Sequence, residues 1–143
     1  MYKIAISSDH SGFILKEKIV VLLRQMGHRV VDYGTDCQTK SVDYPDYAKL
    51  VCESLAEEIC AFGILLCGSG IGMSIAANRF SHIRAALCRT VQEAILARSH
   101  TNANILVLAA KFISFDEAHK VISNFLVTGF EGGRHANRIA KIR

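Results

Sequence analysis

The chain has 143 residues, half of them hydrophobic, 21% charged, with a net charge of +4; these values fit a single folded domain over residues 1–143 and exclude a disordered chain. No apolar run approaches the about 18 residues that a membrane-spanning helix needs, and the first residues carry no signal-peptide pattern, so we expect no membrane partner. Five cysteines without a C-x-x-C pair argue against a disulfide framework or a zinc cluster and for the reducing cytoplasm.

Strand-like runs alternate with helical patterns along the first half of the chain. Residues 3–7 and 29–33 are rich in strand-forming residues, and the apolar residues between them recur at helical spacing up to a stop signal at Gly27. A polar, irregular stretch over 34–44 leads to Pro45, the only proline, which suits the first turn of a helix. We therefore expect strand, helix, strand, loop and helix in this order.

The second half continues the alternation around a glycine-rich loop. The run 62–67 is almost wholly apolar, as is typical of a strand buried on both faces. A Thr or Ser followed three residues later by Glu, the spacing of a capping box, predicts two helix starts. The elements predicted after the loop are a helix at 73–78, strands at 83–88 and 104–109, helices at 90–99 and 114–128, and a short basic helix after EGGR.

Strands and helices in alternation predict an α/β fold with three layers, α/β/α, in which a five-stranded parallel sheet of Rossmann-like type has helices on both faces. Ligands of such sheets bind beyond the carboxyl ends of the strands. Polar clusters follow two of the strands, at 7–10 and at 67–72. A third cluster, 99–102, follows a helix and precedes its strand, so the sequence does not place it at the same edge.

The loop after the third strand reads CGSGIG, with glycines at 68, 70 and 72. Successive backbone N–H groups in a glycine turn ahead of a helix bind anions, which makes Gly68, Gly70 and Gly72 candidate substrate-binding residues. The spacing differs from the dinucleotide fingerprint, and no lysine follows as in a P-loop. The alternative is a tight turn that needs glycine only for its backbone conformation.

A cysteine, Cys67, stands at the first position of this loop. A cysteine at the end of a buried strand is commonly a small core residue. Amide groups and a helix N-terminus beside it would favour the thiolate, and the same amides would stabilise an oxyanion on a substrate. A base beside an oxyanion hole is what proton abstraction next to a carbonyl requires.

Other candidate residues have simpler alternatives. Asp9 and His10 follow the first strand, where Asp9 would serve equally as a helix cap, whereas His10 would donate to a phosphate or a sugar hydroxyl. His100 lies in the polar stretch RSHTNAN, where a solvated loop histidine is the other interpretation. Arg134 and Arg138 are four residues apart and share a helix face, an arrangement that suits a phosphate monoester.

The last ten residues, RHANRIAKIR, contain four Lys or Arg residues and no acid. A basic tail binds nucleic acid, binds a small phosphate, or forms a solvated helix face. The tail is short and has no aromatic residue for base stacking. We therefore expect no nucleic-acid partner.

Five motifs in register, SSDHSGF, DYPDYA, CGSGIGMSIAANR, RSH-x-x-AN and EGGRHANR, resemble ribose-5-phosphate isomerase type B across essentially the whole chain. That family includes galactose-6-phosphate and allose-6-phosphate isomerases. The resemblance implies an aldose–ketose isomerase of the pentose phosphate pathway. It would interconvert D-ribose 5-phosphate and D-ribulose 5-phosphate through an enediolate, without metal or organic cofactor. It also implies a homodimer with active sites at the subunit interface, and leaves open whether dimers pair into tetramers.

The resemblance also assigns the reacting groups. Cys67 matches the base of the family's cysteine branch, and Met73 stands where the other branch has a glutamate. Ser69 matches a hydroxyl beside the reacting oxygens, with the amides of residues 68–72 as the anion hole. His100 would open the furanose ring and serve the neighbouring subunit's Cys67.

The substrate contacts implied by the resemblance are Asp9 and Tyr44 at the sugar, and His10, Arg134 and Arg138 at the phosphate. The sequence departs from the family pattern at two positions. Thr101 stands where the family commonly has asparagine, and Lys111 stands at a phosphate-contacting arginine. Lysine keeps the charge but loses the bidentate fork of arginine, so both departures bear on substrate length and affinity.

Two other functions fit the same residues. One is isomerisation of a hexose 6-phosphate, which needs more room opposite the phosphate. The other is a sugar-phosphate or nucleotide sensor that binds at the loop without turnover. Comparing kcat/KM for ribose and allose phosphates separates the first from the leading hypothesis, and ligand-induced stabilisation without turnover would indicate the second.

Overall fold

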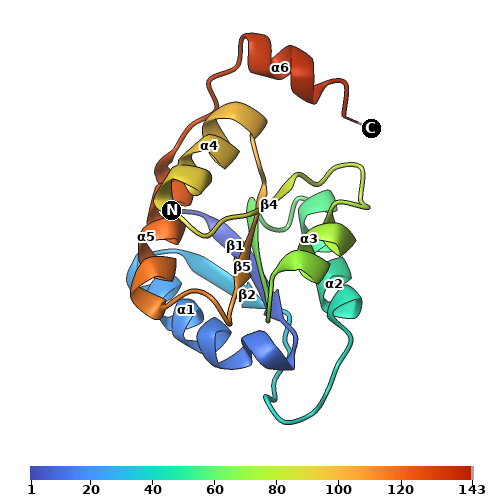
Figure 1. Cartoon of the computed structure of the whole chain (residues 1–143), viewed down its shortest axis with the longest axis vertical. Coiled ribbons are helices and arrows are strands. Elements are labelled where there is room, and N and C mark those ends of the chain that lie inside the picture. Colours follow the sequence, from blue (N-terminus) through green and yellow to red (C-terminus); the bar gives the residue numbers. More distant parts are fainter. Residues whose placement is uncertain (143) are drawn as a thin grey trace.

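The computed structural model describes residues 1–142 and consists of one parallel β-sheet between two layers of helices (Figure 1). The strands lie in the order β2-β1-β3-β5-β4, and every neighbouring pair is parallel. The strands are β1 (Lys3–Ser8), β2 (Arg29–Asp32), β3 (Phe62–Cys67), β4 (Ala85–Leu87) and β5 (Ile105–Ala109). The predicted five-stranded α/β/α fold is confirmed.

Helices cover both faces of the sheet, and each layer has its own apolar core. One layer contains α1 (Phe13–Gln25), α4 (Val91–Thr101) and α5 (Phe115–Val127), and the opposite layer contains α2 (Tyr44–Ala56) and α3 (Ile71–Ala77) (Figure 1). All six residues of β3 are buried because helices pack on both of its faces. A 3₁₀ turn, η1 (His10–Gly12), follows β1, and α6 (Arg134–Ile139) stands beyond α4 at one end of the molecule (Figure 1).

The local signals for helix starts and stops are confirmed. Pro45 lies in the first turn of α2, and Gly27, at φ +89°, follows the end of α1. The hydroxyl oxygens of Thr90 and Ser114 each accept a hydrogen bond, at 3.1 Å, from the backbone N–H three residues later. These oxygens satisfy N–H groups that the first turn of a helix leaves without intrahelical partners.

Three predicted elements have different boundaries in the structure. The helix expected at 73–78 is α3, which starts two residues earlier, at Ile71. The fourth strand pairs only over Ala85–Leu87, because β4 is an edge strand whose residues are only partly buried. Helix α4 continues two residues beyond Ser99 to Thr101, and it is followed by the cap residue Asn102, whose φ of +47° is the left-handed conformation common at helix ends. His100 therefore lies on a helix and not in a polar turn.

The end of α4 lies at the amino edge of the sheet. The helix starts beyond the carboxyl end of β4 and runs back to the residues that precede β5. Asn104 donates from its backbone to the carbonyl of Arg84 and accepts from Gly63, which fixes this connection at the amino ends of β4 and β3. The cluster at 99–102 therefore lies at the edge opposite Cys67. No helix within residues 1–142 has the length and apolar character to cross a bilayer.

Candidate active site

The loop that follows β3 exposes backbone N–H groups in a fixed conformation. Gly70 has φ +74°, and a Cβ there would lie 2.5 Å from a methyl carbon of Leu87. The carbonyl of Gly68 accepts from the backbone N–H of Lys111 at 3.0 Å, which ties the loop to the end of β5. Within residues 1–142, the N–H groups of Gly68, Ser69 and Gly70 donate no hydrogen bond. Such a row of free amides can bind an anion.

Cys67 ends β3 immediately before these amides. Its residue is 5% exposed, and its carbonyl accepts from the N–H of Ala110 at 2.9 Å. The hydroxyl oxygen of Ser69 accepts from the N–H of Ile71 at 3.2 Å, so its proton remains available to a ligand oxygen. A thiol, a hydroxyl and free amides thus occupy one turn of backbone, which is what a proton-transfer site at an oxyanion needs.

Two side chains from other segments lie against the loop, and each lies so close to a glycine that a Cβ there would be crowded. A Cβ on Gly72 would lie 2.5 Å from ring carbons of Tyr44, and a Cβ on Gly68 would lie 3.1 Å from Cε of Lys111. The ring of Tyr44 comes from the start of α2, and Lys111 follows β5. The glycines therefore serve different purposes: Gly70 supplies a left-handed conformation, while the other two allow close approach.

The polar cluster after β1 lies next to this loop, because β1 pairs with β3. Asp9 is buried, and its Oδ1 accepts from the N–H of Gly12 at 3.1 Å, so the helix-cap interpretation holds for this residue. His10 accepts from the N–H of Val42 at Nδ1, 3.2 Å away, and thereby holds the loop before α2. A neutral ring that accepts at Nδ1 carries its proton on Nε2, where it can donate to an anion.

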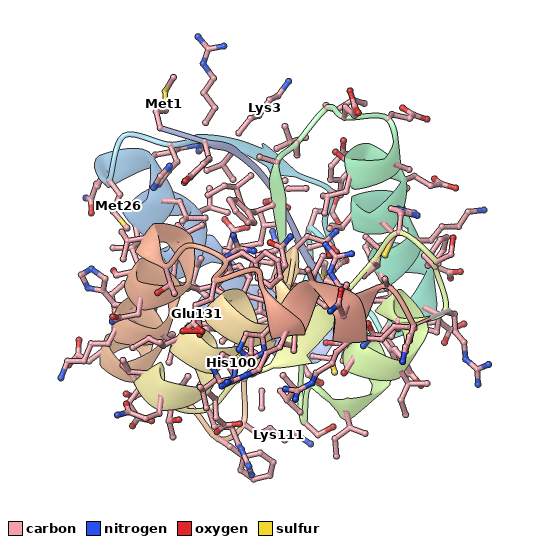
Figure 2. All side chains as sticks on the ribbon, turned by 90° about the horizontal axis from the view of Figure 1, so that it is seen from above. Met1, Lys3, Met26, His100, Lys111 and Glu131 are labelled. Atoms are coloured by element: carbon pink, nitrogen blue, oxygen red, sulfur yellow. The ribbon has the colours of Figure 1, made fainter. Side chains whose placement is uncertain are left out.

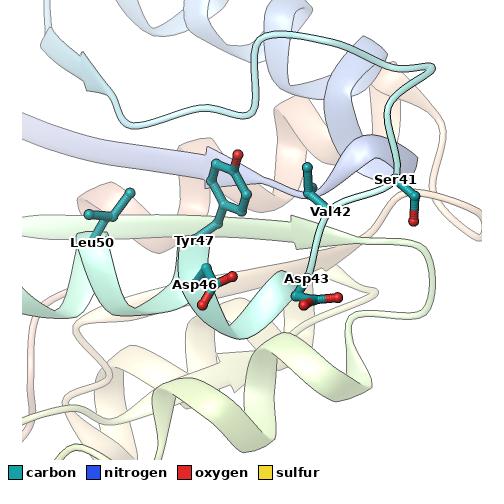
Figure 3. A pocket seen from close by; sticks show the side chains of 6 residues that line it. All are labelled: Ser41, Val42, Asp43, Asp46, Tyr47 and Leu50. Atoms are coloured by element: carbon teal, nitrogen blue, oxygen red, sulfur yellow. The ribbon is translucent and has the colours of Figure 1, made fainter.

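An open cavity of about 470 Å³ lies along the start of α2 (Figure 3). Figure 3 shows the carboxylates of Asp43 and Asp46 along this wall. Acidic groups repel a phosphate, so this cavity is unsuited to the phosphate end of a substrate. Its lining residues are Ser41, Val42, Asp43, Asp46, Tyr47 and Leu50.

The remaining candidates gather at the amino edge. His100 has its Nε2 3.8 Å from Oε2 of Glu131, and its ring stacks on that of His135 with centroids 4.1 Å apart. Figure 2 shows His100 beside Glu131. Burial lowers the pKa of His135, and the neighbouring His100 and Arg134 lower it further. Arg134 itself is exposed on α6, as is Arg138.

A single chain therefore holds two separate groups of candidate residues. The carboxyl edge brings together Cys67, Ser69, the three glycines, Tyr44 and Lys111, with the Asp9–His10 pair adjacent. The amino edge carries His100, Thr101 and the two arginines of α6. Thr101 stands where the family commonly has asparagine. Its hydroxyl donates to the carbonyl of Ala97, so this hydroxyl proton is used in a hydrogen bond within α4.

Sequence reasoning missed Glu131 and His135 as partners of His100. They are four residues apart in EGGRH, but Glu131 lies before α6 starts at Arg134, so helical spacing does not predict their contact. The stacking of His135 on His100 depends on α6 folding back over the end of α4, which no local pattern predicts.

The fold and this loop define a Rossmann-like α/β protein with a glycine-rich turn and a thiol at the carboxyl edge of its sheet. The sequence model of the Ribose/Galactose Isomerase family matches residues 4–142, and the chain belongs to that family. Ribose-5-phosphate isomerase B of Escherichia coli is 41% identical over 142 residues, which cover 99% of this chain and 95% of that protein.

Two solved structures are similar over nearly their whole lengths. A ribose 5-phosphate isomerase of Thermotoga maritima superposes with a TM-score of 0.97 at 55% identity, covering 99% of this chain and 97% of that one. Ribose-5-phosphate isomerase B of Mycoplasma genitalium with bound ribulose-5-phosphate has a TM-score of 0.94 at 42% identity, covering 98% and 93%.

Proposed function

We propose that this protein is an aldose–ketose isomerase that interconverts D-ribose 5-phosphate and D-ribulose 5-phosphate. One observation carries the proposal: Cys67 stands directly before the free N–H groups of residues 68–70, where a base and an oxyanion hole are both needed. Family membership over residues 4–142 supports the reaction. The similarity to a structure with bound ribulose-5-phosphate supports a phosphorylated pentose as substrate.

The mechanism moves one proton between neighbouring carbons. The Cys67 thiolate takes the proton from C2 of the open-chain aldose, and the electron pair of that C–H bond forms the enediolate double bond. The carbonyl oxygen, now negative, accepts from the amides of Gly68 to Gly70. The hydroxyl of Ser69 donates to the reacting oxygens. The hydroxyl proton at C2 of the enediolate passes to the oxygen on C1, and the electron pair left on the C2 oxygen forms the ketose carbonyl. The electrons of the former double bond then take the proton back from sulfur at C1.

The second proposed feature is a homodimer that completes each site. His100, Arg134 and Arg138 are needed for ring opening and for the phosphate, yet they lie at the edge of the sheet opposite Cys67. A second copy would bring its amino edge to the carboxyl edge of the first. Lys111 and His10 would then contact the phosphate from the chain that supplies Cys67.

The reaction is tested with ribose 5-phosphate and purified protein, with Cys67→Ala alongside. Removing a general base typically costs about 10²–10⁴-fold in rate, so kcat should fall by that factor. Cys37→Ala is the matched control: it removes a thiol that lies outside the loop after β3, on the loop between β2 and α2. A Cys67→Ala enzyme with wild-type kcat would show that the base lies elsewhere. Ligand-induced stabilisation without turnover in the wild type would indicate a sensor.

Shared sites are tested by mixing two inactive variants. A dimer that pairs a Cys67→Ala chain with a His100→Asn chain has one site in which both residues are intact. Random exchange of subunits should restore roughly a quarter of the wild-type activity, because half of the dimers are mixed and each has one intact site. If each chain used its own His100 with its own Cys67, mixing would restore nothing.

A further inference from the structure

Three side chains around the end of α4, those of His100, Glu131 and His135, bring ligand-forming atoms close together. Nε2 of His135 lies 3.4 Å from Oε2 of Glu131, and Nε2 of His100 lies 3.8 Å from the same oxygen. All three atoms lie within 4.8 Å of one another. Ligand atoms around a tetrahedral zinc ion are about 3.3–3.5 Å apart, given bonds of roughly 2.0–2.1 Å. The two histidine–glutamate separations are therefore close to those of a zinc site.

The backbone holds these three residues in place without a metal. The N–H of Glu131 donates to the carbonyl of Ser99 at 3.0 Å, which fixes the loop before α6 on the last turn of α4. Arg98 anchors that turn from beneath: its Nη1 donates to the side chain of Asn102 at 2.9 Å, and its guanidinium lies 4.9 Å from the centre of the Phe62 ring. His135, whose side chain is 8% exposed, is held between α6 and α4. The backbone positions of the three residues are therefore fixed before an ion binds, which lowers the entropy cost of binding.

We propose that His100, Glu131 and His135 form a binding site for Zn²⁺, with water in the fourth position. Two histidines and one glutamate are a donor set that zinc enzymes use, with one position left open. The side chains of His100 and Glu131 are 40% and 57% exposed, so an ion can enter from solvent. The two rings are nearly parallel, at 15°, so binding requires His100, the more exposed of the two, to rotate until its Nε2 lone pair points at the ion.

The consequence for activity rests on the proposed function, whereas binding does not. A His100 that ligates zinc cannot transfer a proton to the ring oxygen of the sugar, because its Nε2 lone pair is used. Zinc would therefore inhibit ring opening. The same ion should inhibit less when the substrate is already in its open-chain form, as ribulose 5-phosphate is, so the forward and reverse reactions should differ in sensitivity.

The test is metal binding to the full-length protein after removal of metal with a chelator. Zn²⁺ is titrated against a chromophoric chelator, and Co²⁺ is used as a spectroscopic substitute. We expect one ion per chain, with affinity at least about 100-fold lower in Glu131→Gln and in His135→Asn, since even outer-shell partners contribute 10–100-fold. His119→Asn, on the exposed face of α5, is the matched control and should bind as the wild type does.

Glu131→Gln changes an exposed side chain, so it tests the site even if His135→Asn folds poorly. The proposal is overturned if both variants bind zinc as the wild type does, or if no stoichiometric binding occurs. It is also overturned if bound Co²⁺ shows an intense sulfur charge-transfer band that Cys67→Ser or Cys37→Ser removes, because the ligand would then be a thiol. None of these readouts needs isomerase turnover, so a failure of the proposed function would be seen separately.

Discussion

The contact between Tyr44 and Gly72 allows a sharp test of how the loop is organised. A Cβ at position 72 would lie 2.5 Å from ring carbons of Tyr44, whereas carbon atoms in contact are about 3.5–4.0 Å apart. In Gly72→Ala the ring must therefore retreat by about 1 Å. Tyr44 is 38% exposed, so it can move towards solvent without disturbing the core. The variant should lose the position of Tyr44 while keeping the fold.

The size of the effect follows from two opposing contributions. A displacement of about 1 Å in a substrate-positioning group can cost about 10²-fold in rate, or about 2.7 kcal/mol of transition-state stabilisation. Alanine in the first turn of α3 gains up to about 1 kcal/mol over glycine in helix propensity, which offsets the lost ring contacts. We expect kcat/KM for ribose 5-phosphate to fall about 100-fold, with the free energy of unfolding changed by less than about 1 kcal/mol.

A double-mutant cycle isolates the contact. With Tyr44→Ala as background there is no ring to displace, so Gly72→Ala should cost little further activity. The measurements are steady-state kinetics and urea unfolding on the four proteins of the cycle. An equal cost of Gly72→Ala in both backgrounds would refute the reasoning, as would an unchanged kcat/KM in the single variant.

Three further predictions concern Gly70, Lys111 and the cysteines outside the loop after β3. Gly70→Ala places a Cβ at φ +74°; this should cost roughly 1–2 kcal/mol for the left-handed conformation, plus about 1–3 kcal/mol for overpacking, and equal unfolding midpoints would contradict it. Lys111→Met should raise KM for the sugar phosphate about tenfold or more with a smaller effect on kcat, since charged hydrogen bonds contribute about 1.5–3 kcal/mol; unchanged KM would remove Lys111 from the phosphate site. Hydrogen bonds to Thr39 lower the pKa of the Cys37 thiol, whereas burial raises the pKa of Cys52 and of Cys88 to about 12. At pH 8, mass spectrometry after iodoacetamide treatment should therefore find Cys37 alkylated well before the other two, because the thiolate is the nucleophile.

Much of the fold was readable from local sequence patterns. The buried strand at 62–67, the turn residues and the Ser and Thr caps were predicted from apolar periodicity and side-chain hydrogen bonding, and the structure confirms them. Such signals act between residues a few positions apart. The end of α4 was misjudged because Ser99 to Asn102 are polar in sequence, although packing against α5 and α6 keeps the helix intact to Thr101.

The candidate site was only partly readable. The thiol and glycines of 67–72 are contiguous, so the sequence could bring them together, and Asp9 and His10 followed from the parallel sheet. The role of Gly72 beneath Tyr44 could not be read, because the ring arrives from α2. The pairing of His100 with His135 and Glu131 was missed for the same reason: it joins α4 to a segment more than thirty residues later.

The sequence by itself determined the order of strands and helices along the chain, the family, and the loop with Cys67 at its start. These depend on short-range periodicity, turn chemistry and contiguous motifs. Only the tertiary structure decided where the residues around His100 and α6 lie relative to Cys67. Side chains carry no local record of the direction in which a helix returns along a sheet. Packing of α4 against the sheet sets His100 at the amino edge, opposite Cys67, and leaves each chain with two separated groups of candidate residues.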